Sequence, residues 1–211
     1  AAATPAALTL TANGSLRTAV DLALSANRGI ALDRDSGGAF TPATGKTLTV
    51  AGVIAATTGS GSSLTGGNLT HAGSGTLVLA GANTFAGAVN VTADGATLVV
   101  QNVAALGTGA AVNAVAGSTL RFDVAGAPLT LAKTLTVGAA AGKVLSLNQG
   151  GSDVAFTGGL AGAGDLTQTS AGKLTLGGTS AYAGKLSLFA GSTLELASAG
   201  ALNGSSLAGN L

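Results

Sequence analysis

The sequence predicts an all-β protein, a parallel β-helix (β-solenoid) of about ten coils in which short strands stack along one axis. Three observations lead to this class. Triplets of the form apolar-x-apolar recur along the chain, a long phrase is repeated within it, and 35 of the 211 residues are Gly whereas only 8% are charged. The 46% apolar content argues against a disordered chain, because disordered chains are poor in residues that bury apolar area.

The triplets have the period-two alternation of β-strands, with two apolar side chains on one face and a small or polar residue on the other. Examples are LTV from Leu48, LVL from Leu77 and LTL from Leu174, and clusters of Gly, Asn, Asp and Ser separate them. Helical spacing is visible only in Ser15 to Gly29, where Leu16 and Val20 could share a helical face. We favour strands there and keep a helix as the alternative.

The internal repeat decides between a sandwich, a barrel and a solenoid. GNLTHAGSGTLVLAGANTFAG, from Gly67, aligns without a gap with GDLTQTSAGKLTLGGTSAYAG, from Gly164. Equivalent strands recur after about one coil, for example after 21 residues from Leu77 to Leu98, so the chain would make on the order of ten coils and a rod roughly 45–50 Å long. We treat residues 1–211 as one domain, with repeat copies near 67–107 and 164–204 and a candidate N-terminal cap at 1–29.

Strand alternation predicts which side chains point inward. The repeat copies should contribute Leu77, Leu79, Val89, Val91, Leu98, Val100, Leu174, Leu176, Leu186, Leu188, Leu194 and Leu196. Phe85 and Tyr182 occupy the same slot in the two copies. We expect both rings to pack at a corner between adjacent coils, where an aromatic ring fills the space beside glycine.

The repeated segment resembles that of a known family. GSGTLVLAGANTFAGAVNVTADGATLVVQNVAALG, residues 73–107, is similar to the β-strand repeat of autotransporter passenger regions, and residues 171–204 form a weaker copy that departs from the pattern at Lys173, Thr179 and Ser180. The resemblance implies a right-handed parallel β-helix displayed outside a Gram-negative cell and carried there by a C-terminal membrane barrel. The chain ends at SSLAGNL without the alternating strands of such a barrel, so we expect a passenger fragment, a released passenger or a relative exported by another route.

Groups that carry chemistry are few. His71 is the only histidine, its counterpart in the second copy is Gln168, and we interpret both as polar strand residues. The chain has no Cys and no nucleophile-elbow, phosphate-binding or zinc-protease motif. A net charge of +1 from dispersed charges predicts no nucleic-acid partner. We therefore predict no catalytic residue, no cofactor, no metal and no membrane insertion by this segment.

Acidic residues and threonines are further candidates for functional residues. Asp33 and Asp35 form the one constellation worth testing for catalysis, although a solvated turn at a strand end is the favoured interpretation. A calcium-binding interpretation of the segment at Gly150 fails because its glycine–aspartate spacing does not repeat. Three further aspartates lie in different predicted coils: Asp123, Asp153 and Asp165. Thr-x-Thr pairs are too sparse for an ice-binding array and occur at Thr9, Thr47, Thr134 and Thr167.

These observations favour a non-catalytic extracellular scaffold or adhesin, a passenger-type stalk on the cell surface. The alternative is a self-assembling filament or layer subunit, because a β-helix has two open edges that must be capped or paired. A polysaccharide-active β-helix enzyme is a distant third. The expected partners are cell-surface or matrix components, or other copies of the chain.

Overall fold

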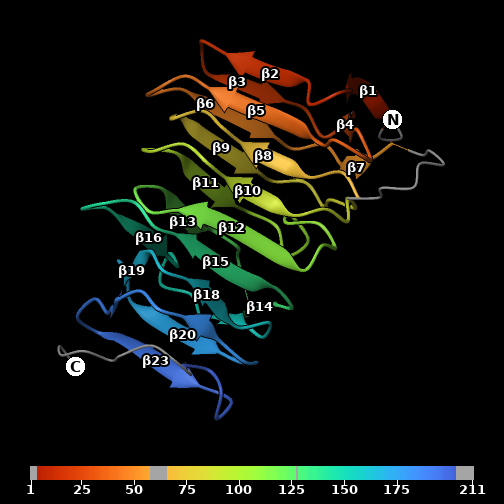
Figure 1. Cartoon of the computed structure of the whole chain (residues 1–211). Coiled ribbons are helices and arrows are strands. Elements are labelled where there is room, and N and C mark those ends of the chain that lie inside the picture. The colour runs from red at the N-terminus through yellow and green to blue at the C-terminus, as the bar shows by residue number, and fades with distance from the viewer. Residues whose placement is uncertain (1–3, 58–65, 127, 203–211) are drawn as a thin grey trace.

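The computed structural model of this chain describes residues 4–57, 66–126 and 128–202. From one end to the other, the chain winds as a stack of coils whose strands run parallel (Figure 1). The described residues contain strands, turns and bends but no helix, and therefore no helix that could cross a membrane. The predicted all-β solenoid is confirmed.

Two sheets of eight strands extend along the whole stack. We call them sheet I and sheet II. Sheet I consists of β2 (Ser15–Thr18), β5 (Gly38–Pro42), β8 (Leu69–His71), β10 (Val89–Val91), β12 (Ala111–Val115), β15 (Thr134–Gly138), β18 (Leu160–Gly162) and β21 (Ala181–Tyr182). Sheet II consists of β3 (Leu22–Leu24), β6 (Thr47–Val50), β9 (Thr76–Leu79), β11 (Thr97–Val100), β13 (Thr119–Phe122), β16 (Val144–Asn148), β19 (Asp165–Gln168) and β22 (Leu186–Ser187).

The third side of the stack carries two shorter sheets. Sheet III-N, in the first coils, consists of β1 (Thr4–Leu10), β4 (Arg28–Leu32) and β7 (Ile54–Ala56). Sheet III-C, in the last coils, consists of β14 (Leu129–Leu131), β17 (Val154–Phe156), β20 (Gly172–Leu176) and β23 (Ser192–Leu196). Between them, residues 80–88 and 101–110 cross this side without a strand.

The described residues form eight coils, whereas about ten were predicted for the chain. The prediction assumed 21 residues per coil, but paired positions are 29 residues apart from Leu48 to Leu77 and 27 apart from Leu120 to Leu147. Coils longer than 21 residues account for the difference. The candidate helix from Ser15 to Gly29 is absent, and its residues form β2, β3, the turns around them and the start of β4.

Most of the predicted inward side chains are in the core. Leu77, Leu79, Val89, Val91, Leu98, Val100, Leu174 and Leu176 are at most 1% exposed. In the last coil Leu186 and Leu194 pack against the core but are only half-buried, as is Leu188, and the prediction was wrong for Leu196, which is exposed. β22 and β23 each pair with one neighbouring strand in the described part of the chain, so their side chains are covered from one side only.

The two repeat copies lie on different faces of the stack. In the first copy β8 belongs to sheet I and β9 to sheet II, whereas the equivalent strands of the second copy, β19 and β20, belong to sheet II and sheet III-C. From β8 to β18 the chain makes four coils on sheet I, and β19 follows on the next face. The copies are therefore offset by four coils and one face, and the repeat specifies a strand–corner–strand unit without specifying a side.

The aromatic position shared by the two copies, Phe85 in the first and Tyr182 in the second, is buried in both, as predicted. Phe85 is 0% exposed and Tyr182 is 1% exposed. The Tyr182 Oη atom lies 2.8 Å from the carbonyl oxygens of Gly164 and Lys185, so its single proton can be donated to either. A Cβ atom at Gly107 would lie 2.9 Å from the Phe85 ring, which explains the glycine beside this slot.

Asn83 holds three coils together where the third side lacks a strand. Its Oδ1 accepts a hydrogen bond from the Ile54 N–H at 2.8 Å, and its Nδ2 donates to the Ala105 carbonyl. Ser180 replaces it in the second copy and still accepts a hydrogen bond from the Leu160 N–H at 2.9 Å. This departure from the repeat pattern keeps one of the two contacts between coils.

We predict that Phe85→Ala lowers the free energy of unfolding by about 3–5 kcal/mol, because it leaves a cavity among close-packed coils. Thermal unfolding followed by circular dichroism measures the change. Val103→Ala is the control, because Val103 is 66% exposed and its truncation should leave the midpoint nearly unchanged. Equal midpoints for Phe85→Ala and the wild type would show that the ring is not part of the core.

Candidate functional site

His71 and Gln168 lie inside the solenoid and not on its surface. Both side chains are 0% exposed. The His71 Nε2 atom lies 3.2 Å from the Gly75 carbonyl oxygen, and the Gln168 Nε2 atom donates to the Gly172 carbonyl at 2.9 Å. In both copies, then, a polar group bonds to the carbonyl four residues ahead and braces a corner. The signal was present in the sequence, because His71 and Gln168 are two residues after the inward residues Leu69 and Leu166.

Lys133 is a second buried polar group, which the sequence reasoning missed. It is 7% exposed, and its Nζ donates to the carbonyls of Gly107 and Gly109. Burial lowers its pKa below the ordinary value. Its contacts anchor residues 101–110, which cross the third side without a strand, and thus serve the fold.

Asp33 and Asp35 lie in a turn that follows β4, in agreement with the favoured interpretation. The Asp33 Oδ1 accepts hydrogen bonds from the backbone N–H groups of Ser36 and Asp35, both at 2.9 Å, and its Oδ2 accepts one from Ala12 at 3.4 Å. The bonds from the Ser36 and Asp35 backbone lower the pKa of Asp33 to about 2. A carboxylate held ionised in this way stabilises the turn and is poorly suited to act as a general acid.

The other three candidate aspartates do not meet. Asp165 begins β19 and Asp123 follows β13, so they lie at opposite ends of strands in sheet II, while Asp153 precedes β17 in sheet III-C. Asp153 and Asp165 accept backbone N–H groups of Lys173 and Lys185 at 2.8 and 2.9 Å. Among the described residues no group of three His, Cys, Asp or Glu side chains could hold a metal ion.

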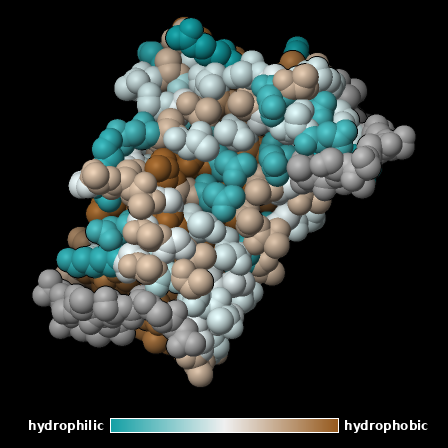
Figure 2. Space-filling model, viewed as in Figure 1, coloured by the Kyte–Doolittle hydropathy of each residue, from teal (hydrophilic) through white to brown (hydrophobic). Residues whose placement is uncertain are grey.

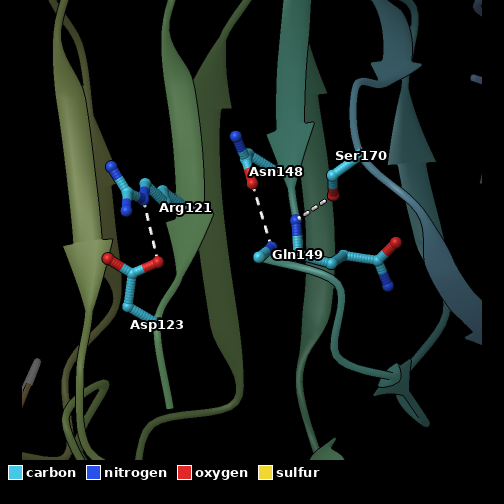
Figure 3. A network of polar contacts seen from close by, with 6 residues as sticks. Arg121, Asp123, Asn148, Gln149 and Ser170 are labelled. Carbon is cyan, nitrogen blue, oxygen red and sulfur yellow. Dashed lines mark hydrogen bonds and ion pairs between the residues drawn. The ribbon is translucent and has the colours of Figure 1, made fainter. Parts of the chain in front are cut away.

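The corner after β13 and β16 is polar, as Figure 3 shows. The Arg121 Nε atom lies 2.8 Å from Asp123 Oδ1, and Asn148 Oδ1 accepts the Gly150 N–H at 2.9 Å. The Gln149 N–H donates to Ser170 Oγ at 2.7 Å (Figure 3). These contacts satisfy turn and strand-end groups, so the segment at Gly150 serves as a corner of the coil.

A further pair of opposite charges lies on the outer face of sheet III-C. The Lys173 Nζ atom lies 2.6 Å from Glu195 Oε2, and Thr175 Oγ1 lies 3.3 Å from the same oxygen. This pairing raises the pKa of Lys173 and lowers that of Glu195. With Asp153 and Thr130 they line a shallow groove, in which the Lys173 ammonium faces two carboxylates and leaves an excess of negative charge.

A regular surface feature runs along sheet II. Seven hydroxyl residues at the outward position of consecutive strands are in register and half-buried, and we call them the hydroxyl rank: Thr47, Thr76, Thr97, Thr119, Ser146, Thr167 and Ser187.

The spacing of Thr-x-Thr pairs within single strands does not predict this rank. Of those pairs, the ones at Thr47 and Thr167 contribute to the rank, while those at Thr9 and Thr134 lie on sheets III-N and I. In seven of the eight sheet II strands a hydroxyl residue stands just before an inward residue, and this signal identifies the rank once the neighbouring strands are known.

Comparison with known families identifies the repeated unit. Residues 69–100 and 166–196 match the family model described as Passenger-associated-transport-repeat. The first match covers β8 to β11, and the second ends with β23. The chain thus carries two copies of an autotransporter passenger repeat, as the resemblance in the sequence implied. No curated protein and no solved structure gives a match to the chain.

We predict that the wild-type protein loses stability as the pH falls from about 4 to 2 because Asp33 becomes protonated. Asp33→Asn should not show this loss. The folded-state pKa of Asp33, about 2, is below its ordinary value of 3.8, so its contribution is complete above pH 3.8 and is lost as pH falls through 2. Urea midpoints at a series of acidic pH values measure it, with Asp35→Asn as the neighbouring control. Identical pH profiles for the wild type and Asp33→Asn would contradict the turn-stabilising role.

Proposed function

We propose that this chain is a non-catalytic scaffold, a passenger-type stalk displayed on the outer surface of a Gram-negative cell. The observation that carries the proposal is that both passenger repeats are built into one stack through two uninterrupted eight-stranded sheets. Eight coils at the β spacing give a rod of roughly 35–40 Å, which is suited to hold a surface away from its anchor.

The described polar groups support a structural role. His71, Gln168, Lys133 and Asp33 all bond to backbone groups at corners and turns. In the view of Figure 2, hydrophilic residues are spread over the face in several small groups, and the net charge of the chain is +1. These features argue for recognition through a neutral face and against steering of a charged partner.

Of the described surfaces, the hydroxyl rank best suits contact with a cell-surface or matrix component. It is uncharged, and it presents the same group at each coil, roughly 4.8 Å apart. Hydroxyls both donate and accept hydrogen bonds, which fits a partner rich in hydroxyl or amide groups. Contact along the rank would use several coils at once.

We expect Thr119→Glu, in the middle of the rank, to weaken binding of the purified chain to cells or matrix by about tenfold, because an unpaired carboxylate would be desolvated at the contact. Thr136→Glu is the matched control, since Thr136 is an equally half-buried outward threonine on sheet I. Binding to immobilised matrix, measured by surface plasmon resonance, compares them. Equal losses for the two variants would exclude sheet II as the contact face.

Self-assembly is the second candidate, and one observation favours it. Four of the six exposed large hydrophobic residues lie in the first or last described coils: Val20, Leu22, Phe189 and Leu196. Stacking of one copy on another would cover them. Sedimentation velocity over a concentration range should then show growing species that Leu22→Ser with Leu196→Ser abolishes. A single monomeric species at all concentrations would leave display as the function.

A further inference from the structure

We infer that His71 is an acid-sensitive clamp, which holds three successive coils together near neutral pH and is weakened when the surroundings become mildly acidic. The inference concerns the fold of the first repeat and is independent of the proposed display function.

The ring contacts carbonyl groups of three coils. The His71 Nε2 atom lies 3.2 Å from both the Gly75 oxygen, in its own coil, and the Thr97 oxygen at the start of β11 in the next coil. The Nδ1 atom lies 3.5 Å from the Phe40 oxygen of β5 in the preceding coil. All three partners are acceptors, so the ring can serve them only by donating protons.

The neutral ring has one proton to donate. Placed on Nε2, it serves Gly75 or Thr97 and leaves Nδ1 facing the Phe40 oxygen without a proton. A second proton on Nδ1 would add a hydrogen bond to Phe40, but it would also place a full charge on a side chain that is 0% exposed.

No carboxylate offsets that charge. The strands around the ring, β5, β9, β10 and β11, contain no charged residue. The neighbouring corner turns carry Lys46 and Asp94, and Asp94 is exposed and pairs with Lys143. Burial is the dominant effect and lowers the pKa of His71 below 6.5, although the three carbonyls oppose it.

The direction of the pH effect follows from linkage. A lowered pKa means that the folded state takes up its proton less readily than the unfolded state does. The stability supplied by the clamp is therefore complete above pH 6.5 and is lost as pH falls from there through the folded-state pKa. Across that interval the folding equilibrium constant falls by up to about tenfold per pH unit.

The chain itself provides the matched control. Gln168 is equally buried and bonds to the carbonyl four residues ahead, but an amide does not titrate between pH 4 and pH 8. His71→Gln should therefore keep the contact with Gly75 and lose its dependence on pH. Gln168→His should add a second step of the same kind in the second repeat.

Two measurements test the clamp. Because His71 is the only histidine, its ring proton NMR signals in the unmodified protein report its titration without assignment, and we expect a midpoint below pH 6.5. Urea unfolding from pH 7.5 to pH 4.5 should show a larger loss of stability in the wild type than in His71→Gln.

A ring midpoint at or above 6.5, or equal pH profiles for the wild type and His71→Gln, would overturn the inference. If His71→Gln does not fold, the ring titration and the Gln168→His variant decide instead. A Gln168→His protein that folds but shows no additional acid-dependent loss would also count against a clamp of this type.

Discussion

Hydrogen bonding between consecutive coils is the interaction on which the rest of this structure depends. The strands of sheets I and II pair only with strands of the coils before and after them, so each coil relies on its neighbours for its backbone partners. The same pairing fixes the register, which places each side chain directly beside its equivalents. An inward apolar row such as Leu48, Leu77, Leu98, Leu120 and Leu147 follows from this register. A row of like charges would repel itself, which is consistent with the low content of charged residues.

Polar side chains enter the interior where the corners require them. A buried carbonyl without a donor costs about 1–3 kcal/mol, and the turns between sheets leave several carbonyls facing inward. His71, Gln168 and Lys133 each donate to one or more of them. Asn83 performs a similar task on the side that lacks a strand, where it serves one acceptor and one donor. Chemistry-bearing residue types are thus used as structural donors, which explains why they are few and scattered.

Much of the fold could be predicted from the sequence, because strand alternation and repeat length are local patterns. They located the core positions from Leu77 to Val100 and the buried slot of Phe85 and Tyr182. They did not give the number of coils, since corner length varies and leaves no periodic signal. They also did not show that His71 is buried, because a polar residue at an inward position looks like an outward one unless its register with Leu69 is followed. The hydroxyl rank on sheet II depends on which strands become neighbours, and the spacing within single strands does not contain that information.

The offset between the two repeat copies determines the directions in which the copies face around the rod. A whole number of coils would place equivalent outer residues on one line parallel to the axis. The additional face instead turns the second copy about that axis by one side of the stack, from sheets I and II to sheets II and III-C. The number of faces between the copies therefore sets the direction in which the later copy points. A strand gained or lost between them would change that direction, whereas a longer coil, such as the 29 residues from Leu48 to Leu77, leaves it unchanged. A chain built in this way can present the same repeat in different directions around its axis without altering the repeat itself.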